Sequence, residues 1–147
     1  MKRMIVGFIA MASLAATVGL RAQHEAKKSA GSHLGTWQLV SYKYGTNQPS
    51  FAEPPSSQRR LKLITETHFT WVQFDAGNKK VQGVAGGSYS LNGDTYTESI
   101  DWADSGMESY LGNKHAFTIR VDGDKFFLSG SLGDGLKIEE VWQRVKP

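Results

Sequence analysis

Cysteine is absent from this 147-residue chain. Disulfide bonds, catalytic thiols, cysteine-bound zinc and iron–sulfur clusters are therefore excluded, and the core alone must stabilise the fold. Histidine is scarce, at four residues, and none stands at the spacing of an H-x-H or H-E-x-x-H metal motif. We expect no metal site and no other cofactor.

Several enzyme signatures are missing as well. The sequence has no G-x-S-x-G nucleophile elbow, no P-loop and no dinucleotide-binding G-x-G-x-x-G. It also lacks a helix of ordinary length with one apolar face. The sequence therefore identifies no catalytic residue.

The first 23 residues have the order of a secretory signal peptide. Lys2 and Arg3 form a short basic start, residues 4–20 are apolar, and residues 21–23 end the run. The alternative is an uncleaved membrane anchor, for which this apolar run is at the short limit. We expect a signal peptide at 1–23, a flexible leader at 24–33 and one domain at 34–147. The protein would be secreted or periplasmic, with no stable membrane insertion after cleavage.

The chain has no large excess of one charge. Its 17 basic and 14 acidic side chains give a net charge of +3. Lys2, Arg3 and Arg21 would leave with the signal peptide, so 14 side chains of each sign would remain. A nucleic-acid-binding protein needs a basic footprint, and we therefore expect no nucleic-acid partner.

From residue 34 onward, short runs rich in β-branched and aromatic residues alternate with turn signals. Asn92-Gly93 and Asp122-Gly123 are hairpin signals, because these residue types tolerate positive φ. The prolines of segment 45–57 favour a loop or lid, and segment 102–113 favours a loop with a short helical turn. We expect strands at residues 34–44, 59–65, 67–75, 80–91, 94–101, 114–121, 125–131 and 136–145.

Sequential hairpins of this kind predict an all-β fold. About eight antiparallel strands, with the last able to pair with the first, favour an up-and-down barrel, which leaves no exposed sheet edge. Gly83, Gly86 and Gly87 lie inside one expected strand and indicate a bend or a close approach of another backbone. A barrel of this size holds packed side chains or one small ligand.

Gly35-Thr36-Trp37 resembles the G-x-W start of the lipocalin and fatty-acid-binding-protein superfamily. In that superfamily an arginine of the last strand packs over this tryptophan, so the resemblance implies that Arg144 packs on Trp37 and closes the barrel. Such a contact contributes about 0.5–2 kcal/mol. The domain as a whole resembles bacterial exported lipocalin-like proteins of unassigned function, through residues 64–71, 86–91, 93–98 and 139–144. The resemblance implies a fold and no particular activity.

Alternation along the strands gives candidate ligand-binding residues. Side chains two positions apart in a strand share a face. Tyr96 therefore lies on the same face as Glu98, and Glu140 on the same face as Trp142. Tyr89 is on the strand that precedes the one with Tyr96. A face that combines aromatic, acidic and apolar side chains fits a ligand pocket. The alternative is an ordinary outer surface.

Two further candidates are cationic or titratable. His68 lies in a strong strand and would serve as a base or as an anchor for a ligand carboxylate; the alternative is a partly buried histidine with a hydrogen bond. Arg120 lies between Ile119 and Val121. Inside the barrel it would need an anion, such as a ligand carboxylate or Glu98. With Ile119 and Val121 inside, it would be on the outer face.

Three functions remain open. The first is an exported binding protein that holds one small, largely apolar molecule, with an acidic ligand left open, so the expected partner is a hydrophobic or amphipathic compound. The second is an isomerase, cyclase or hydrolase on the same barrel, using Glu98, His68 or Tyr96 as acid and base. The third is an envelope interaction protein whose barrel is filled by its own aromatic side chains.

Overall fold

The computed structural model describes residues 32–146. The expected signal peptide and residues 24–31 of the expected leader lie outside this range. The regular secondary structure of the described chain is all β, apart from a three-residue 3-10 helix, η1 (Glu108–Tyr110). No helix among the described residues is long and apolar enough to cross a membrane.

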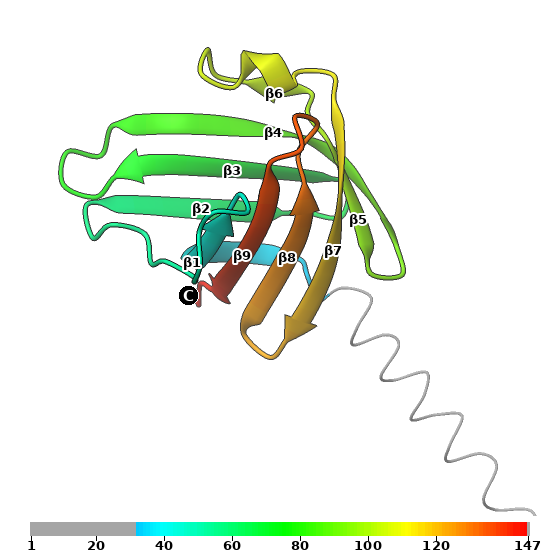
Figure 1. Cartoon of the computed structure of the whole chain (residues 1–147), viewed down its shortest axis with the longest axis horizontal. Helices are drawn as coiled ribbons and strands as arrows, with labels where there is room; N and C mark the ends of the chain where they lie inside the picture. The colour runs from blue at the N-terminus through cyan, green and yellow to red at the C-terminus, as the bar shows by residue number, and fades with distance from the viewer. Residues whose placement is uncertain (1–31, 147) are drawn as a thin grey trace, which may run out of the picture. The chain divides into compact units, whose positions relative to one another are not determined.

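Eight strands form a closed antiparallel barrel (Figure 1). Each barrel strand pairs with the next barrel strand along the chain, including β3 with β4. The first strand, β1, pairs with the last, β9, and this pairing closes the ring. The prediction of an eight-stranded up-and-down barrel is confirmed. The barrel strands are β1 (Gly35–Tyr44), β2 (Gln58–Ile64), β3 (His68–Asp75), β4 (Val81–Asn92), β5 (Thr95–Ser99), β7 (Lys114–Asp122), β8 (Lys125–Ser131) and β9 (Lys137–Arg144).

One pairing was not expected from the sequence. The two-residue strand β6 (Trp102–Ala103) pairs with β4 beside Ala85 and Gly86. The chain passes so close to β4 here that a Cβ on Gly87 would lie 2.0 Å from the Ser99 carbonyl oxygen. Glycine at this position therefore allows the crossing that the run of strand glycines indicated.

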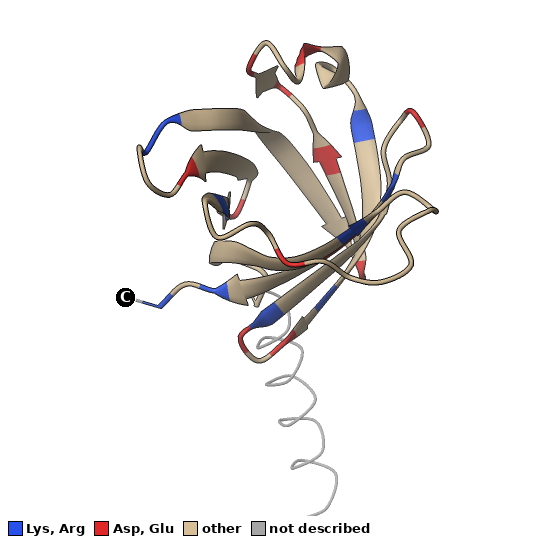
Figure 2. Ribbon diagram, turned by 60° about the vertical axis from the view of Figure 1, so that its left-hand side comes forward, with Lys and Arg blue, Asp and Glu red and all other residues tan. Residues whose placement is uncertain are grey.

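The up-and-down order places the connections at two ends of the barrel. Segments 65–67, 93–94 and 123–124 lie at the end where β1 begins, which we call the closed end. Segments 45–57, 76–80, 100–113 and 132–136 lie at the other, which we call the open end. The longer connections are therefore all at the open end. Basic and acidic positions are interspersed over strands and loops (Figure 2).

The closed end contains the most tightly packed part of the core. Trp37 is fully buried against Phe126, with ring centroids 5.3 Å apart. The Arg144 guanidinium lies 4.0 Å from the centroid of the Trp37 ring and donates to the Leu34 carbonyl at 2.8 Å. This is the arrangement that the lipocalin resemblance implies. Gly35 has φ +123°, and a Cβ there would lie 2.9 Å from an Arg144 nitrogen, so both backbone and space favour glycine.

The folded domain includes His33, the last residue of the expected flexible leader. His33, which we assigned to the leader, is buried. One ring nitrogen lies 2.9 Å from the Tyr89 hydroxyl, and the His33 carbonyl accepts a hydrogen bond from the Trp37 indole at 2.8 Å. These contacts hold His33 against the closed end and make it part of the domain.

Removing the Trp37 side chain tests this closure. Trp37→Ala should lower the free energy of unfolding by about 3–5 kcal/mol, because it leaves a cavity in the core and removes the partner of Arg144. Urea denaturation followed by circular dichroism measures the change. Phe51→Ala, in the half-exposed loop 45–57, is the control and should cost less than about 1 kcal/mol. Equal effects of the two changes would contradict this role of Trp37.

Candidate functional site

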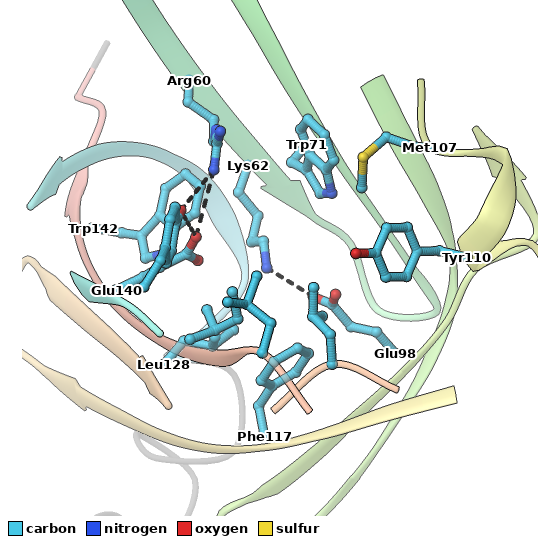
Figure 3. A pocket seen from close by; sticks show the side chains of 14 residues that line it. Arg60, Lys62, Trp71, Glu98, Met107, Tyr110, Phe117, Leu128, Glu140 and Trp142 are labelled. Carbon is cyan, nitrogen blue, oxygen red and sulfur yellow. Dashed lines mark hydrogen bonds and ion pairs between the residues drawn. The ribbon is translucent and has the colours of Figure 1, made fainter. Parts of the chain in front are cut away.

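A cavity of about 260 Å³ occupies the open-end half of the barrel interior (Figure 3). Its wall is mainly apolar and includes Phe117, Leu128 and Ile138. Trp71 from β3 and Trp142 from β9 add two indole rings. Its mouth is formed by side chains of the open-end connections, namely Met107, Tyr110, Leu132 and Leu136.

A buried ion pair lies at the inner end of the cavity. The Lys62 ammonium donates to Glu98 Oε1 at 2.7 Å. The two side chains are only 4% and 6% exposed. Lys62 comes from β2 and Glu98 from β5, two strands that are separated in the sheet by β3 and β4. The pair therefore spans the lumen, as Figure 3 shows.

A second polar group lies along β1, β2 and β9. Arg60 donates to the Tyr44 hydroxyl at 2.7 Å, and its guanidinium lies 3.6 Å from the Glu140 carboxylate. Tyr44 donates in turn to Glu140 Oε1, while Oε2 accepts from the Trp142 indole at 3.1 Å. Each of these buried or half-buried polar groups has a partner, which is the condition for retaining them inside a core.

Burial changes the titration of several of these groups. It raises the pKa of Glu98 above its ordinary value of 4.5, against the opposing effect of the Lys62 charge. It also raises the pKa of Tyr44, with a further contribution from the Glu140 charge. The low-polarity interior disfavours the charged form of each group.

Two further buried side chains, Tyr96 and His115, lie near the ion pair. The Tyr96 hydroxyl interacts with the Glu98 carboxylate, whereas neither ring nitrogen of His115 has a hydrogen-bond partner among the described residues. Burial raises the pKa of Tyr96, with a smaller contribution from the nearby Glu98 charge, and lowers the pKa of His115. Both residues are neighbours of Glu98, since Tyr96 is two positions before it and His115 is opposite it on β7. Buried polar side chains on two neighbouring strands therefore lie beside Glu98.

The structure brings three of the predicted ligand-binding residues to the cavity, namely Glu98, Glu140 and Trp142. Two others face inward but lie in the closed-end core. Tyr96 is fully buried there, and Tyr89 donates to the Thr65 carbonyl at 2.7 Å. Their positions exclude them from the cavity wall.

His68 and Arg120 are on the outer face, so neither lies in the cavity as a ligand-binding residue; for Arg120 this is the alternative that follows from an inward-facing Ile119. His68 is exposed, and its Nδ1 lies 2.7 Å from the Thr67 hydroxyl. Arg120 pairs with Asp122 at 3.2 Å and lies over the Phe127 ring. The reason is strand alternation: Phe69 and Ile119 point into the core, so the side chains next to them in sequence point outward.

Sequence reasoning missed the cavity cations. Arg60 and Lys62 alternate along β2 with Leu61 and Leu63. The two cationic side chains face inward, whereas Leu63 is 39% exposed on the outer face. The usual rule of apolar residues inside would place this strand in the opposite orientation. A usable signal was Ile64, which shares a face with Lys62 and belongs to the core.

No family model and no curated protein sequence matches the chain, but solved structures do. A lipocalin-like protein from Bacteroides uniformis has a TM-score of 0.56 at 17% identity, over 78% of this chain and 100% of that one. An uncharacterised protein from Bacteroides eggerthii has a TM-score of 0.53 at 14% identity, over 76% and 98%. A redesigned β-barrel has a TM-score of 0.52 at 17% identity, over 81% and 96%. The resemblance to lipocalin-like proteins is thus confirmed for the fold.

Breaking the ion pair should reveal how strongly its two charges depend on each other. Lys62→Met leaves Glu98 buried without a counter-charge and should lower the free energy of unfolding by about 3–5 kcal/mol near neutral pH. The double variant Lys62→Met/Glu98→Leu should recover most of this loss, because no buried charge then remains. Urea denaturation measures all the variants. A single variant as stable as the wild type would contradict a tightly coupled buried pair.

The pH dependence of Lys62→Met gives a second measure of the same effect. A carboxyl group whose pKa is raised in the folded state binds its proton more tightly there than in the unfolded chain. The buried Glu98 carboxyl group therefore does not reduce the free energy of unfolding at low pH. It reduces this free energy increasingly as the pH rises above 4.5 toward the folded-state pKa. Since Lys62 opposes this rise, Lys62→Met should lose stability with increasing pH more steeply than the wild type.

Proposed function

We propose that this protein is an exported ligand-binding barrel that holds one small, largely apolar molecule in its open-end cavity. The observation that carries the proposal is the cavity itself, a space of about 260 Å³ enclosed by a closed barrel and walled mainly by apolar side chains. Eight-stranded barrels of the lipocalin type have an interior suited to one small ligand. The shared fold with a lipocalin-like protein supports the same class.

The volume limits the size of the ligand. A dry apolar cavity of about 150 Å³ is large enough for benzene, and pockets for drug-sized molecules begin near 300 Å³. The cavity here lies between these values. It therefore favours a compound of one or two rings, or an aliphatic chain of similar volume.

The cavity argues against a barrel that is filled by its own aromatic side chains. That alternative needs all the large aromatic residues of the strands to point inward. Phe69, Trp71, Phe126 and Trp142 do so, but Phe127 packs against Arg120 on the outer face. The interior is consequently underfilled at the open end.

The contacts also favour a carrier over an enzyme. The acid–base set considered for catalysis combined Glu98, Tyr96 and His68. His68 is on the outer face, and Glu98 already holds Lys62 as its partner. A carrier needs only walls and a few polar anchors, and the cavity has both.

Export remains part of the proposal on the strength of the sequence. Lys2 and Arg3, the apolar run 4–20 and its interruption at 21–23 give the order of a cleavable signal. The absence of cysteine is compatible with an oxidising compartment, because the barrel is closed by backbone pairing and by Trp37 and Arg144.

Filling the mouth of the cavity tests the proposal. Leu132→Trp adds bulk to a side chain that lines the cavity, whereas Leu63→Trp adds the same group on the outer face of β2. Saturation-transfer NMR with naphthalene should show binding to the wild type and to Leu63→Trp. Affinity for Leu132→Trp should fall by roughly tenfold or more, since the ring and the new side chain compete for one space. Equal binding to all three proteins would place the naphthalene elsewhere and refute the proposal.

A further inference from the structure

We infer that the ligand of this cavity is uncharged, and that a single polar group on it, such as a hydroxyl, carbonyl or amide, bonds to the Lys62–Glu98 pair. The inference rests on the proposed function and narrows it to a chemical class. It excludes the acidic ligand that the sequence left open.

The charges inside the cavity balance one another. Among the described residues that line it, four are charged: Arg60, Lys62, Glu98 and Glu140. They form two opposite pairs, with 2.7 Å between Lys62 and Glu98 and 3.6 Å between Arg60 and Glu140. The cavity is therefore formally neutral before any ligand binds.

A charged ligand would disturb this balance. A carboxylate would have to share Lys62 with Glu98 and bring two anions to one buried ammonium group, which is unfavourable in an interior of low polarity. Arg60 is no better as a site for a carboxylate, because its charge is already paired with Glu140. The Arg60 guanidinium also donates hydrogen bonds to Gln73 and Tyr44. A cationic ligand would meet the same difficulty beside Lys62.

A neutral polar group can instead add to the pair without breaking it. An ammonium group has three N–H donors, and Lys62 donates one of them to Glu98. The carboxylate has further lone pairs. A hydroxyl group can therefore accept from Lys62 while it donates to Glu98, and the 2.7 Å contact between the charged atoms remains.

The walls around the pair fit a flat ring. Trp71 and Trp142 project into the cavity from β3 and β9, and Phe117 adds a third aromatic surface from β7 (Figure 3). Aromatic rings pack well against one another in offset or edge-to-face arrangements. A fused bicyclic compound with one polar substituent combines this packing with the contact to Lys62 and Glu98.

Three naphthalene derivatives of nearly equal size test the inference. They are 2-naphthol, which is neutral at pH 7, 2-naphthoate, which is anionic, and (2-naphthyl)methylammonium, which is cationic. Isothermal titration calorimetry with the purified protein, expressed from the full sequence, should rank 2-naphthol first by roughly tenfold or more, because neither charged probe finds an unpaired counter-charge.

A variant at the ion pair reverses the expected order. Glu98→Gln leaves Lys62 without its anion, so 2-naphthoate should gain affinity and overtake 2-naphthol. Glu139→Gln is the matched control, since Glu139 is on the outward face of β9 beside Lys43, and should leave the ranking unchanged. If Glu98→Gln does not fold, Lys62→Met/Glu98→Leu keeps the interior neutral. It should bind naphthalene and lose the preference for 2-naphthol over naphthalene.

The outcomes separate this inference from the proposed function. If 2-naphthoate or the ammonium probe binds the wild type as tightly as 2-naphthol, and Leu132→Trp abolishes that binding, the cavity binds ligands but the neutral class is wrong. If naphthalene and all three probes fail to bind, the proposed function falls and this inference falls with it. A preference for 2-naphthol that Glu98→Gln reverses supports both.

Discussion

The buried contact between Lys62 and Glu98 constrains the whole interior of this barrel. Two charges that are both removed from water must lie within direct reach of each other, and these come from β2 and β5, on separate parts of the sheet. The registers of both strands must therefore bring the two side chains together across the lumen. Toward the closed end, Trp37, Tyr96 and Phe126 are fully buried; toward the open end, the interior stays partly empty. The ion pair thus lies between a packed core and the open-end cavity.

Four charged side chains lie among the mainly apolar walls of the cavity, and their mutual contacts explain how they are retained there. Glu140 accepts from Tyr44 and Trp142 and lies beside Arg60, so its charge is well compensated. Lys62 also lies 5.4 Å from the centroid of the Trp142 ring, where the aromatic face stabilises its charge. These contacts fix side chains before any ligand arrives. Under the proposed function, the charges that are already paired would restrict the ligand in addition to the shape of the cavity.

Most of the fold follows from local features of the sequence, whereas about half of the site does not. Hairpin signals such as Asn92-Gly93 are local, and the strand boundaries expected from them agree with the observed ones to within a residue or two over most of the barrel. Which face of a strand points inward depends on neighbours across the lumen. On β5 the pattern of Tyr96 and Glu98 was informative, but on β2 the leucines point outward and the cations inward. The partner of Lys62 is 36 residues away in sequence, and a single sequence gives no means of pairing them.

A crystal structure of the protein grown with 2-naphthol tests the central claim most directly. We expect electron density for one molecule inside the open-end cavity, with its rings near Trp71 and Trp142 and its oxygen within hydrogen-bonding distance of Lys62 and Glu98. The Lys62–Glu98 contact should remain intact beside it. An interior closed by repacked side chains, or density only on the outer surface, would contradict a ligand-binding barrel organised around this ion pair.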